Sequence, residues 1–373
     1  MRTLGAIAVL IVAAPALASL ADPDEPMAIP ATADGQGEAL PFDRFNQRMI
    51  TLVNIADPRL LDGKMNRDRL KVLARVNAVK NPKALPPEQA AFLAVDYMRL
   101  GNGDGLYLNK AIDLLAPHLR DRRPSYFVCT TLAAIHVARG GEFAEAIDKQ
   151  EAALLDCEMP AEVKGWSTAE RNWIAQLDRE YVPYYLRIRR SEADPATRPS
   201  LETIGPTPLF PLPSKTGPAE PVRFVNEAGK YEPGVLAKAE RDKLPPDAIA
   251  IVQQLLLWFP TDARLLWLLA ELYAADGKFK EADTITYQCT ASRNYAPRQL
   301  LEHRGAIVKA LAAQEKRAAE QAKAALPAEP EEEPISLRAI WLYFAGVIAI
   351  ATVALVRGWT KRGKANGGMN CCR

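Results

Sequence analysis

Apolar residues recur at spacings of three and four along most of the chain, which is the pattern of helices with one buried face. Phe42, Phe45 and Met49 begin the first such series, and Leu70 and Leu73 belong to the second. The pattern persists through residues 41–193 and returns in residues 233–325. We therefore expect an all-α fold in two helical sections.

The segment between these sections, residues 194–232, is rich in proline. Proline lacks a backbone N–H and interrupts helices, so no helix is expected here. Two arrangements remain open: an extended linker, or a segment that wraps along the helices with Leu209, Phe210 and Leu212 as apolar anchors. Residues 19–40 are rich in Ala, Pro, Asp and Gly, and we expect a flexible leader there.

The first residues have the order of a secretory signal: Arg2, then an apolar run, then small residues before an acidic stretch. We predict a signal peptide at residues 1–18, with cleavage after Ala18 as the first choice and after Ala21 as the second. An uncleaved N-terminal anchor is the alternative, although the apolar run is short for a membrane span.

A second apolar run lies near the C-terminus, where residues 339–356 include no charged side chain. As a helix this run would rise about 27 Å, close to the hydrocarbon thickness of a bilayer. We predict a transmembrane helix at residues 338–356, after an acidic, proline-rich stalk at 326–337 and before a basic tail at 357–373. The alternative is a buried core helix.

The basic tail indicates orientation, because positively charged flanks stay in the cytoplasm. The C-terminus is therefore expected in the cytoplasm and the N-terminal domain on the exported face, in the periplasm or an equivalent compartment.

Residues 265–289 contain bulky, small and aromatic residues at fixed offsets: Trp267, Leu269, Ala270, Tyr273, Gly277, Phe279 and Ala282. Residues 131–154 repeat part of this order with Ala134, Gly141, Phe143 and Ala146. Ala248 and Ala282 stand about 34 residues apart, which is the period of one such unit. Both segments resemble the tetratricopeptide repeat.

This resemblance implies a solenoid of stacked helix pairs that binds a protein or peptide on its concave face. The first helix of each pair would supply the contact residues, namely Val128, Thr131, Ile135 and Arg139 in one repeat and Arg264, Trp267, Glu271 and Ala275 in the other. Trp267 has an alternative role, which is packing against the neighbouring helix.

The chain has a formal net charge of +2, but the short tail holds five Lys or Arg residues and no acid, so the remainder is mildly acidic. Without a basic stripe there, nucleic-acid binding is disfavoured. The three histidines, His118, His136 and His303, belong to no recognisable catalytic or metal motif. We therefore predict no catalytic residue, no cofactor and no metal site, and a protein that is not an enzyme.

Five cysteines are present, and none has the spacing of a zinc or redox motif. In the register implied by the repeat, Cys129 begins one helix and Cys157 ends its antiparallel partner, so this pair is a candidate disulfide. Cys289 is expected to be buried and inert.

These features favour a membrane-tethered scaffold for protein–protein interaction on the exported face of the membrane. The alternative is a structural component of the cell envelope that self-associates or contacts cell-wall polymer. The partner and the oligomeric state are left open by the sequence.

Overall fold

The computed structural model describes residues 29–60, 63–101, 105–120, 123–163, 165–214, 217, 219–325 and 341–342. These residues contain helices and no β-strand, which confirms the all-α class. The described residues between 29 and 311 form one compact unit, which contains the first predicted helical section and most of the second. The signal peptide (1–18), stalk (326–337) and tail (357–373) lie outside the described residues, as does all of segment 338–356 except Trp341 and Leu342.

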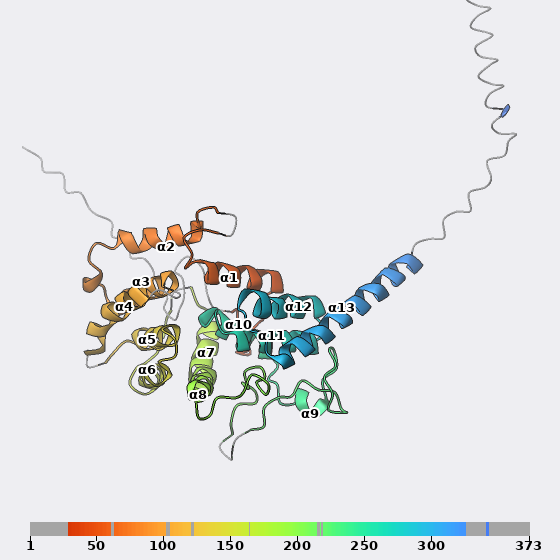
Figure 1. Cartoon of the computed structure of the whole chain (residues 1–373). Coiled ribbons are helices and arrows are strands. Elements are labelled where there is room, and N and C mark those ends of the chain that lie inside the picture. Colours follow the sequence, from red (N-terminus) through yellow and green to blue (C-terminus); the bar gives the residue numbers. More distant parts are fainter. Residues whose placement is uncertain are drawn as a thin grey trace, which may run out of the picture. The chain divides into compact units, whose positions relative to one another are not determined.

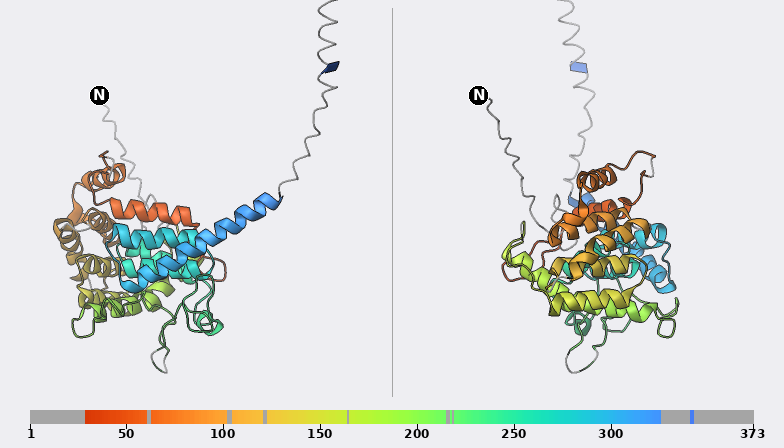
Figure 2. Two further views of the ribbon diagram at one scale, coloured as in Figure 1. Left: turned by 45° about the vertical axis from the view of Figure 1, so that its right-hand side comes forward. Right: turned by 90° about the vertical axis from the view of Figure 1, so that its left-hand side faces the viewer.

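The segment before the first helix is packed, which corrects the expectation of a flexible leader for its residues 29–40. Ile29 is fully buried and Leu40 nearly so. Helix α1 (Phe42–Asn54) then lies along the helices of the second section, where it packs on α10 (Ala248–Trp258) (Figures 1 and 2). Because α1 presents Phe45 and Met49 on one face, it buries this stripe against helices that lie some 200 residues further along the chain.

The remaining helices of the first section follow one another as packed neighbours, except that a π-helical turn (Leu177–Tyr181) joins the last two into one continuous helix. They are α2 (Arg67–Ala78), α3 (Pro87–Leu100), α4 (Gly105–Leu115), α5 (Tyr126–Ala138), α6 (Phe143–Leu155), α7 (Thr168–Gln176) and α8 (Val182–Ala193). Pro87 occupies the first position of α3, where a missing N–H costs nothing. The α5–α6 turn is made by Gly140 and Gly141, both with positive φ.

The second section begins with the short α9 (Lys238–Arg241) and α10, followed by α11 (Ala263–Ala275), α12 (Phe279–Tyr287) and α13 (Arg298–Ala325). Helices α11 and α12 pack as an antiparallel pair around Gly277, whose φ is +74°. Ala270 and Ala282 are fully buried between helices, and their small side chains allow the close approach expected from the repeat pattern.

The proline-rich segment wraps along the helices, as the second of the two sequence-based arrangements predicted. Leu209 and Phe210 are buried, and Leu212 is half-buried against the core. The ring of Phe210 meets that of Tyr181 edge to face at 6.0 Å between centroids. These anchors secure the segment without regular hydrogen-bonded structure.

The last part of helix α13 is rich in alanine, and its residues 312–324 are exposed. Within the described ranges, each helix is either too short or too polar to cross a bilayer.

Candidate functional site

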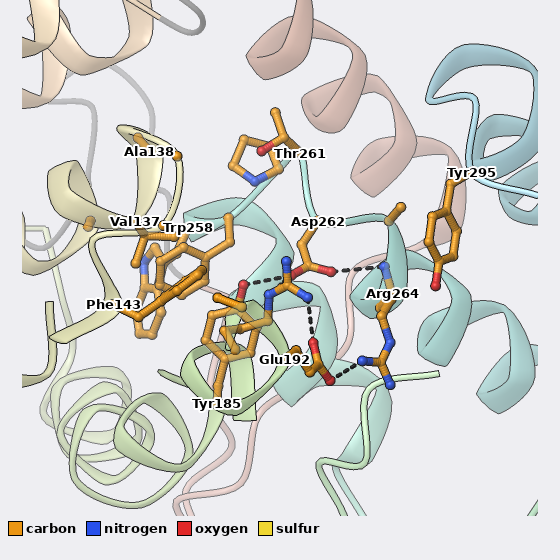
Figure 3. Close-up of a pocket in the computed structure, with 18 of the residues that line it drawn as sticks. Val137, Ala138, Phe143, Tyr185, Glu192, Trp258, Thr261, Asp262, Arg264 and Tyr295 are labelled. Carbon is orange, nitrogen blue, oxygen red and sulfur yellow. Dashed lines mark hydrogen bonds and ion pairs between the residues drawn. The ribbon is translucent and has the colours of Figure 1, made fainter. Parts of the chain in front are cut away.

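A cavity of about 590 Å³ lies in the compact unit where the α5–α6 turn, the end of α8 and the α10–α11 turn meet (Figure 3). This volume lies within the range of sites for small molecules and peptide side chains. The cavity is built from both helical sections, so it depends on the packing of one section against the other.

Aromatic and aliphatic side chains line much of the cavity. Phe143 enters from the start of α6, Tyr185 from α8, and Trp258 from the end of α10 (Figure 3). The ring of Tyr185 stacks on Phe259 with 4.8 Å between centroids. Gly141 lies beside Phe143 with a φ of +110°, a conformation that side chains rarely adopt, and a Cβ atom there would lie 3.3 Å from the Phe143 ring.

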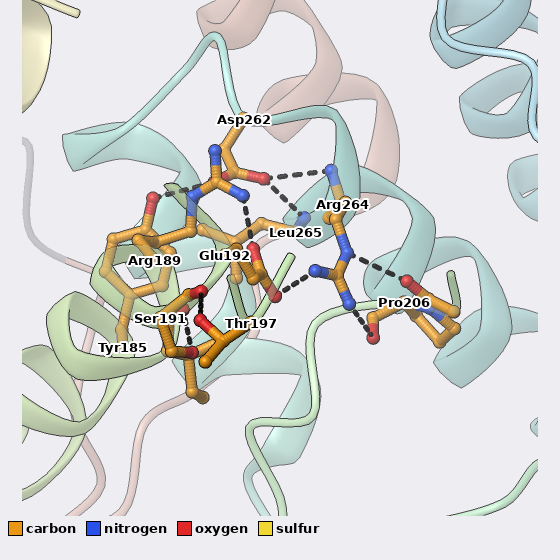
Figure 4. Close-up of polar contacts among 11 residues, drawn as sticks. Tyr185, Arg189, Ser191, Glu192, Thr197, Pro206, Asp262, Arg264 and Leu265 are labelled. Atoms are coloured by element: carbon orange, nitrogen blue, oxygen red, sulfur yellow. Dashed lines mark hydrogen bonds and ion pairs between the residues drawn. The ribbon is translucent and has the colours of Figure 1, made fainter. Parts of the chain in front are cut away.

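Asp262 organises the polar wall of the cavity (Figure 4). Its side chain caps the N-terminus of α11, where Oδ1 accepts hydrogen bonds from the backbone N–H groups of Arg264 and Leu265, both at 2.9 Å. Its Oδ2 accepts a hydrogen bond from the Tyr185 hydroxyl at 2.7 Å and lies 3.2 Å from Arg189 Nε. One carboxylate therefore joins the start of α11 to α8.

Glu192 links the two arginines of this wall. One carboxylate oxygen lies 2.6 Å from Arg189 Nη1, and the other accepts a hydrogen bond from Arg264 Nη1. Arg264 also donates to the carbonyl oxygens of Gly205, at 2.8 Å from Nε, and Pro206, at 3.1 Å from Nη2. The guanidinium group thus ties α8, α11 and the proline-rich segment together (Figure 4).

Three side chains around the cavity, those of Tyr185, Arg189 and Tyr295, keep their protons near neutral pH. Burial, with a further contribution from Asp262, raises the pKa of the Tyr185 hydroxyl well above its usual value, so it remains a donor. Burial alone would lower the pKa of Arg189, but Asp262, Tyr185 and Glu192 outweigh this effect and raise it. Burial also raises the pKa of Tyr295 to about 12. These groups form a wall of constant charge, which suits binding.

The cavity carries more positive than negative charge. Its lining includes Arg99, Arg189, Arg198 and Arg264 against only Glu192 and Asp262. Both acids are already paired with Arg189 and Arg264. Arg198 is exposed, and its side chain has no partner among the described residues. The guanidinium group of Arg198 therefore leaves a positive charge at the cavity wall that no described side chain neutralises.

The structure does not place the predicted contact residues on an open concave surface. Val128, Thr131 and Ile135 are fully buried in α5, so they cannot contact a partner in this conformation. Arg139 is exposed at the end of α5, but its side chain pairs locally with Glu142 at 3.2 Å.

The second set of predicted residues lies on α11, which is buried on nearly all sides. Trp267 is fully buried and its Nε1 donates to Glu271 Oε1 at 2.6 Å, so its alternative role in packing is correct. Glu271 Oε1 also lies 2.7 Å from His303 Nδ1, which attaches α13. Ala275 is half-buried. Arg264 lines the cavity, but its hydrogen bonds are internal.

The cavity residues that the sequence did not reveal come mainly from α8 and the α10–α11 turn. Tyr185, Arg189 and Glu192 lie on one face of α8, at spacings of three and four. That mixed polar and aromatic stripe near a helix end was the available signal. Sequence spacing alone did not indicate that it meets Asp262.

Among the described residues, no three His, Cys, Asp or Glu side chains are grouped to hold a metal ion. Cys129 Sγ and Cys157 Sγ lie 3.8 Å apart as free thiols. Cys289 is fully buried, as expected.

Comparison with protein-family models, with curated proteins and with solved structures finds no match for this chain.

Proposed function

We propose that this protein is a membrane-tethered binding protein whose cavity takes an apolar side chain of a partner peptide together with a neighbouring acidic group. It is a scaffold for protein–protein interaction on the exported face of the membrane, and it acts by binding. The observation that carries this proposal is an aromatic cavity with an excess of arginine.

The aromatic lining suits an apolar anchor. Phe143, Tyr185 and Trp258 offer ring faces in a recessed site, and such sites bind the aromatic and aliphatic anchors that supply most of the energy at protein interfaces. A volume of about 590 Å³ accommodates one or two large side chains of a peptide.

The charge of the lining suits an acidic neighbour to that anchor. Glu192 and Asp262 are neutralised by Arg189 and Arg264, so they do not repel an incoming carboxylate. Arg198 is exposed and its side chain has no partner within the described ranges, so it offers its charge to a ligand. A guanidinium group binds carboxylates through two parallel hydrogen bonds.

The tetratricopeptide-like solenoid is supported by two helix pairs with glycine turns, α5–α6 and α11–α12. The buried alanines Ala146 and Ala282 occupy the positions where the repeat requires small residues. In place of an open concave face, the proposed binding site lies between the two sections. The tether is supported by the uncharged run at residues 339–356.

The binding proposal is tested with two fluorescein-labelled peptides and the full chain in detergent. Both peptides carry a Leu–Phe anchor, followed by two Glu residues in one and two Lys residues in the other. Fluorescence anisotropy should show the acidic peptide binding about tenfold more tightly. Equal affinities for the two peptides would contradict the proposed charge preference.

Two matched variants locate the site. Arg198→Glu should weaken binding of the acidic peptide roughly five- to tenfold, whereas Arg190→Glu, the same charge change at an exposed residue of α8 outside the cavity lining, should leave it unchanged. Ala193→Trp, which adds a ring at the cavity wall, should block binding, and Ala196→Trp should not. If all four variants bind alike, the cavity is not the docking site.

The tether is tested separately by deleting residues 338–356. Loss of the protein from the membrane fraction is expected, and retention there would contradict the predicted span.

A further inference from the structure

The two cysteines of the α5–α6 pair lie at the end of the hairpin that is remote from the cavity. Cys129 stands in the first turn of α5, and Cys157 follows the last residue of α6 and its cap, Asp156. Their sulfur atoms lie 3.8 Å apart. A disulfide requires about 2.05 Å, so a modest rotation of the side chains brings the two atoms to bonding distance.

We propose that Cys129 and Cys157 are a modification site, at which thiol–disulfide exchange closes a disulfide bond across the open end of the α5–α6 hairpin. The site is independent of the cavity's ligand and of the proposed tether, because it rests on the two side chains alone.

Exposure determines the order of the reaction. Cys129 is 1% exposed, whereas Cys157 is half-buried, so an external oxidant reaches Cys157 first. The Cys157 thiolate attacks one sulfur of a small or protein disulfide, forms a mixed disulfide and expels one thiolate. The Cys129 thiolate then attacks Cys157 Sγ and expels the second thiolate. The two cysteines lose two protons and two electrons, and the oxidant disulfide is reduced to two thiols.

The surroundings make the pair unreactive without such an oxidant. Burial and then the neighbouring Cys157 raise the pKa of the Cys129 thiol to about 12, although Lys149 opposes this rise. Burial also raises the pKa of Cys157. Because the thiolate is the reacting form, both thiols are weak nucleophiles at neutral pH. Both exchange steps are therefore slow at neutral pH, and the bond forms over time where a disulfide oxidant is supplied.

The bond would act on the part of the hairpin that builds the cavity. The α5–α6 turn contributes Val137, Ala138 and Phe143 to the lining. Joining the far ends of α5 and α6 limits their separation, which reduces fraying of the pair and restricts the wall that the turn supplies.

Cys289 provides an internal control within the described residues. It is fully buried, and its thiol donates to the carbonyl oxygen of Ala263 at 3.6 Å. Burial raises the pKa of this thiol to about 12. It stays reduced in the folded protein under the same conditions.

The test uses the full chain purified in detergent, first reduced and then exposed to oxidised glutathione. Thiols are alkylated in denaturant at successive times and assigned by peptide mass spectrometry. We expect glutathione to appear transiently on Cys157, followed by a cross-linked peptide pair that contains Cys129 and Cys157, with Cys289 alkylated throughout. Persistence of both thiols, or bonding of either one to another cysteine, would overturn the proposal.

Stability gives a second measurement. Oxidation should raise the melting temperature of the native protein by roughly 5–10 °C, and a reductant should reverse this shift. Cys157→Ser should show no such shift, and Cys289→Ser should retain it. The comparison of oxidised and reduced native protein needs no variant, so it remains decisive if a variant fails to fold. A cross-link without a change in melting temperature would refute the stabilising role of the bond.

Discussion

Two segments without helices cross the compact unit, residues 29–40 before α1 and the proline-rich residues 194–232 after α8. Both have compositions typical of loops, and both are packed against helices. They differ in the kind of side chain that holds their backbone.

The first segment is held mainly by acceptors for its N–H groups. Gln254 Oε1 accepts from Ile29 N at 2.7 Å, Asp247 Oδ2 from Gly37 N at 3.0 Å, and Gln253 Oε1 from Leu40 N at 2.8 Å. Helix α10 and its start thus supply side-chain oxygens where a neighbouring strand would have supplied carbonyl groups.

The proline-rich segment is held mainly by a donor and by apolar anchors. Arg264 donates to the carbonyl oxygens of Gly205 and Pro206, and Leu209 and Phe210 are buried. Proline has no N–H, so the backbone here presents more acceptors than donors. The comparison teaches that supporting side chains complement the backbone groups that a loop presents: acceptors for the N–H groups of residues 29–40, and mainly a donor for the carbonyl groups of the proline-rich segment.

The largest effect is expected when an apolar anchor of the proline-rich segment is removed. Phe210→Ala should lower the free energy of unfolding by about 3–5 kcal/mol, because a large buried ring leaves a cavity. Chemical denaturation of the full chain in detergent measures it, with Leu212→Ala at a half-buried position as the milder companion. A loss no greater than that of Leu212→Ala would show that the segment does not depend on this anchor.

The next largest effect is expected when a side-chain acceptor that binds the backbone of the first segment is removed. Gln253→Leu should cost about 1–3 kcal/mol for each buried group that it leaves unpaired. These groups are the N–H and carbonyl of Leu40 and the Tyr273 hydroxyl, since Gln253 Nε2 also donates to that carbonyl at 3.1 Å and to the hydroxyl at 2.9 Å. Gln176→Leu, at an exposed glutamine, is the control and should change stability little. Similar losses in both variants would contradict the role of Gln253 as a backbone partner.

A smaller effect tests how closely the first segment packs. A Cβ atom on Gly37 would lie 2.2 Å from Trp173 Cζ2 and 2.9 Å from Ala250 Cβ. Gly37→Ala should therefore cost about 1–3 kcal/mol through overpacking. The matched substitution is Gly105→Ala, which meets nothing within 4 Å at the start of α4 and should be neutral or slightly stabilising. Hydrogen exchange of the 29–40 amides would speed up in the first variant alone.

The smallest effect concerns the ion pairs and hydrogen bonds that Glu240 forms near the end of the proline-rich segment, and it depends on pH. Glu240 accepts from Arg223 N at 2.9 Å and pairs with Arg223 and Lys243. Burial acts to raise the pKa of Glu240, but these hydrogen bonds outweigh it and lower the pKa below 4.5. The folded state then binds fewer protons, so this contribution is complete above about pH 5 and lost as the pH falls through the lowered pKa.

Glu240→Gln should therefore cost about 1–2 kcal/mol at pH 7 and progressively less toward pH 3. Unfolding midpoints measured across this range provide the check. If the difference in stability between native and variant protein does not shrink on acidification, the contribution of Glu240 is not electrostatic.

Much of the fold could be predicted from local patterns. The glycines at positions 141 and 277 mark turns between helices where the repeat requires them, and the periodicity of Phe45 and Met49 identifies the buried face of α1. Periodicity does not identify the partner of that face, so the packing of α1 on α10 was not predictable. The overall composition of residues 29–40 is typical of a loop and does not reveal that Ile29 and Leu40 are buried apolar anchors.

The cavity was less predictable, because its residues come from elements far apart in sequence. The repeat pattern predicts Arg264 as a contact residue, but its partners, Glu192 and the carbonyls of Gly205 and Pro206, are supplied by other segments. Trp267 and Glu271 belong to a helix covered on nearly every side, where an amphipathic pattern cannot separate an open face from a buried one.

The contacts of the first segment also set the order in which the chain can mature. Ile29, Leu40 and α1 all find their partners in residues near 250, more than 200 positions later. At common rates of synthesis the ribosome needs about 10–45 s to make that interval. During this time the apolar stripe of α1 has no native surface to cover it. A nascent chain arrested before α10 should therefore be far more sensitive to protease there than the finished protein.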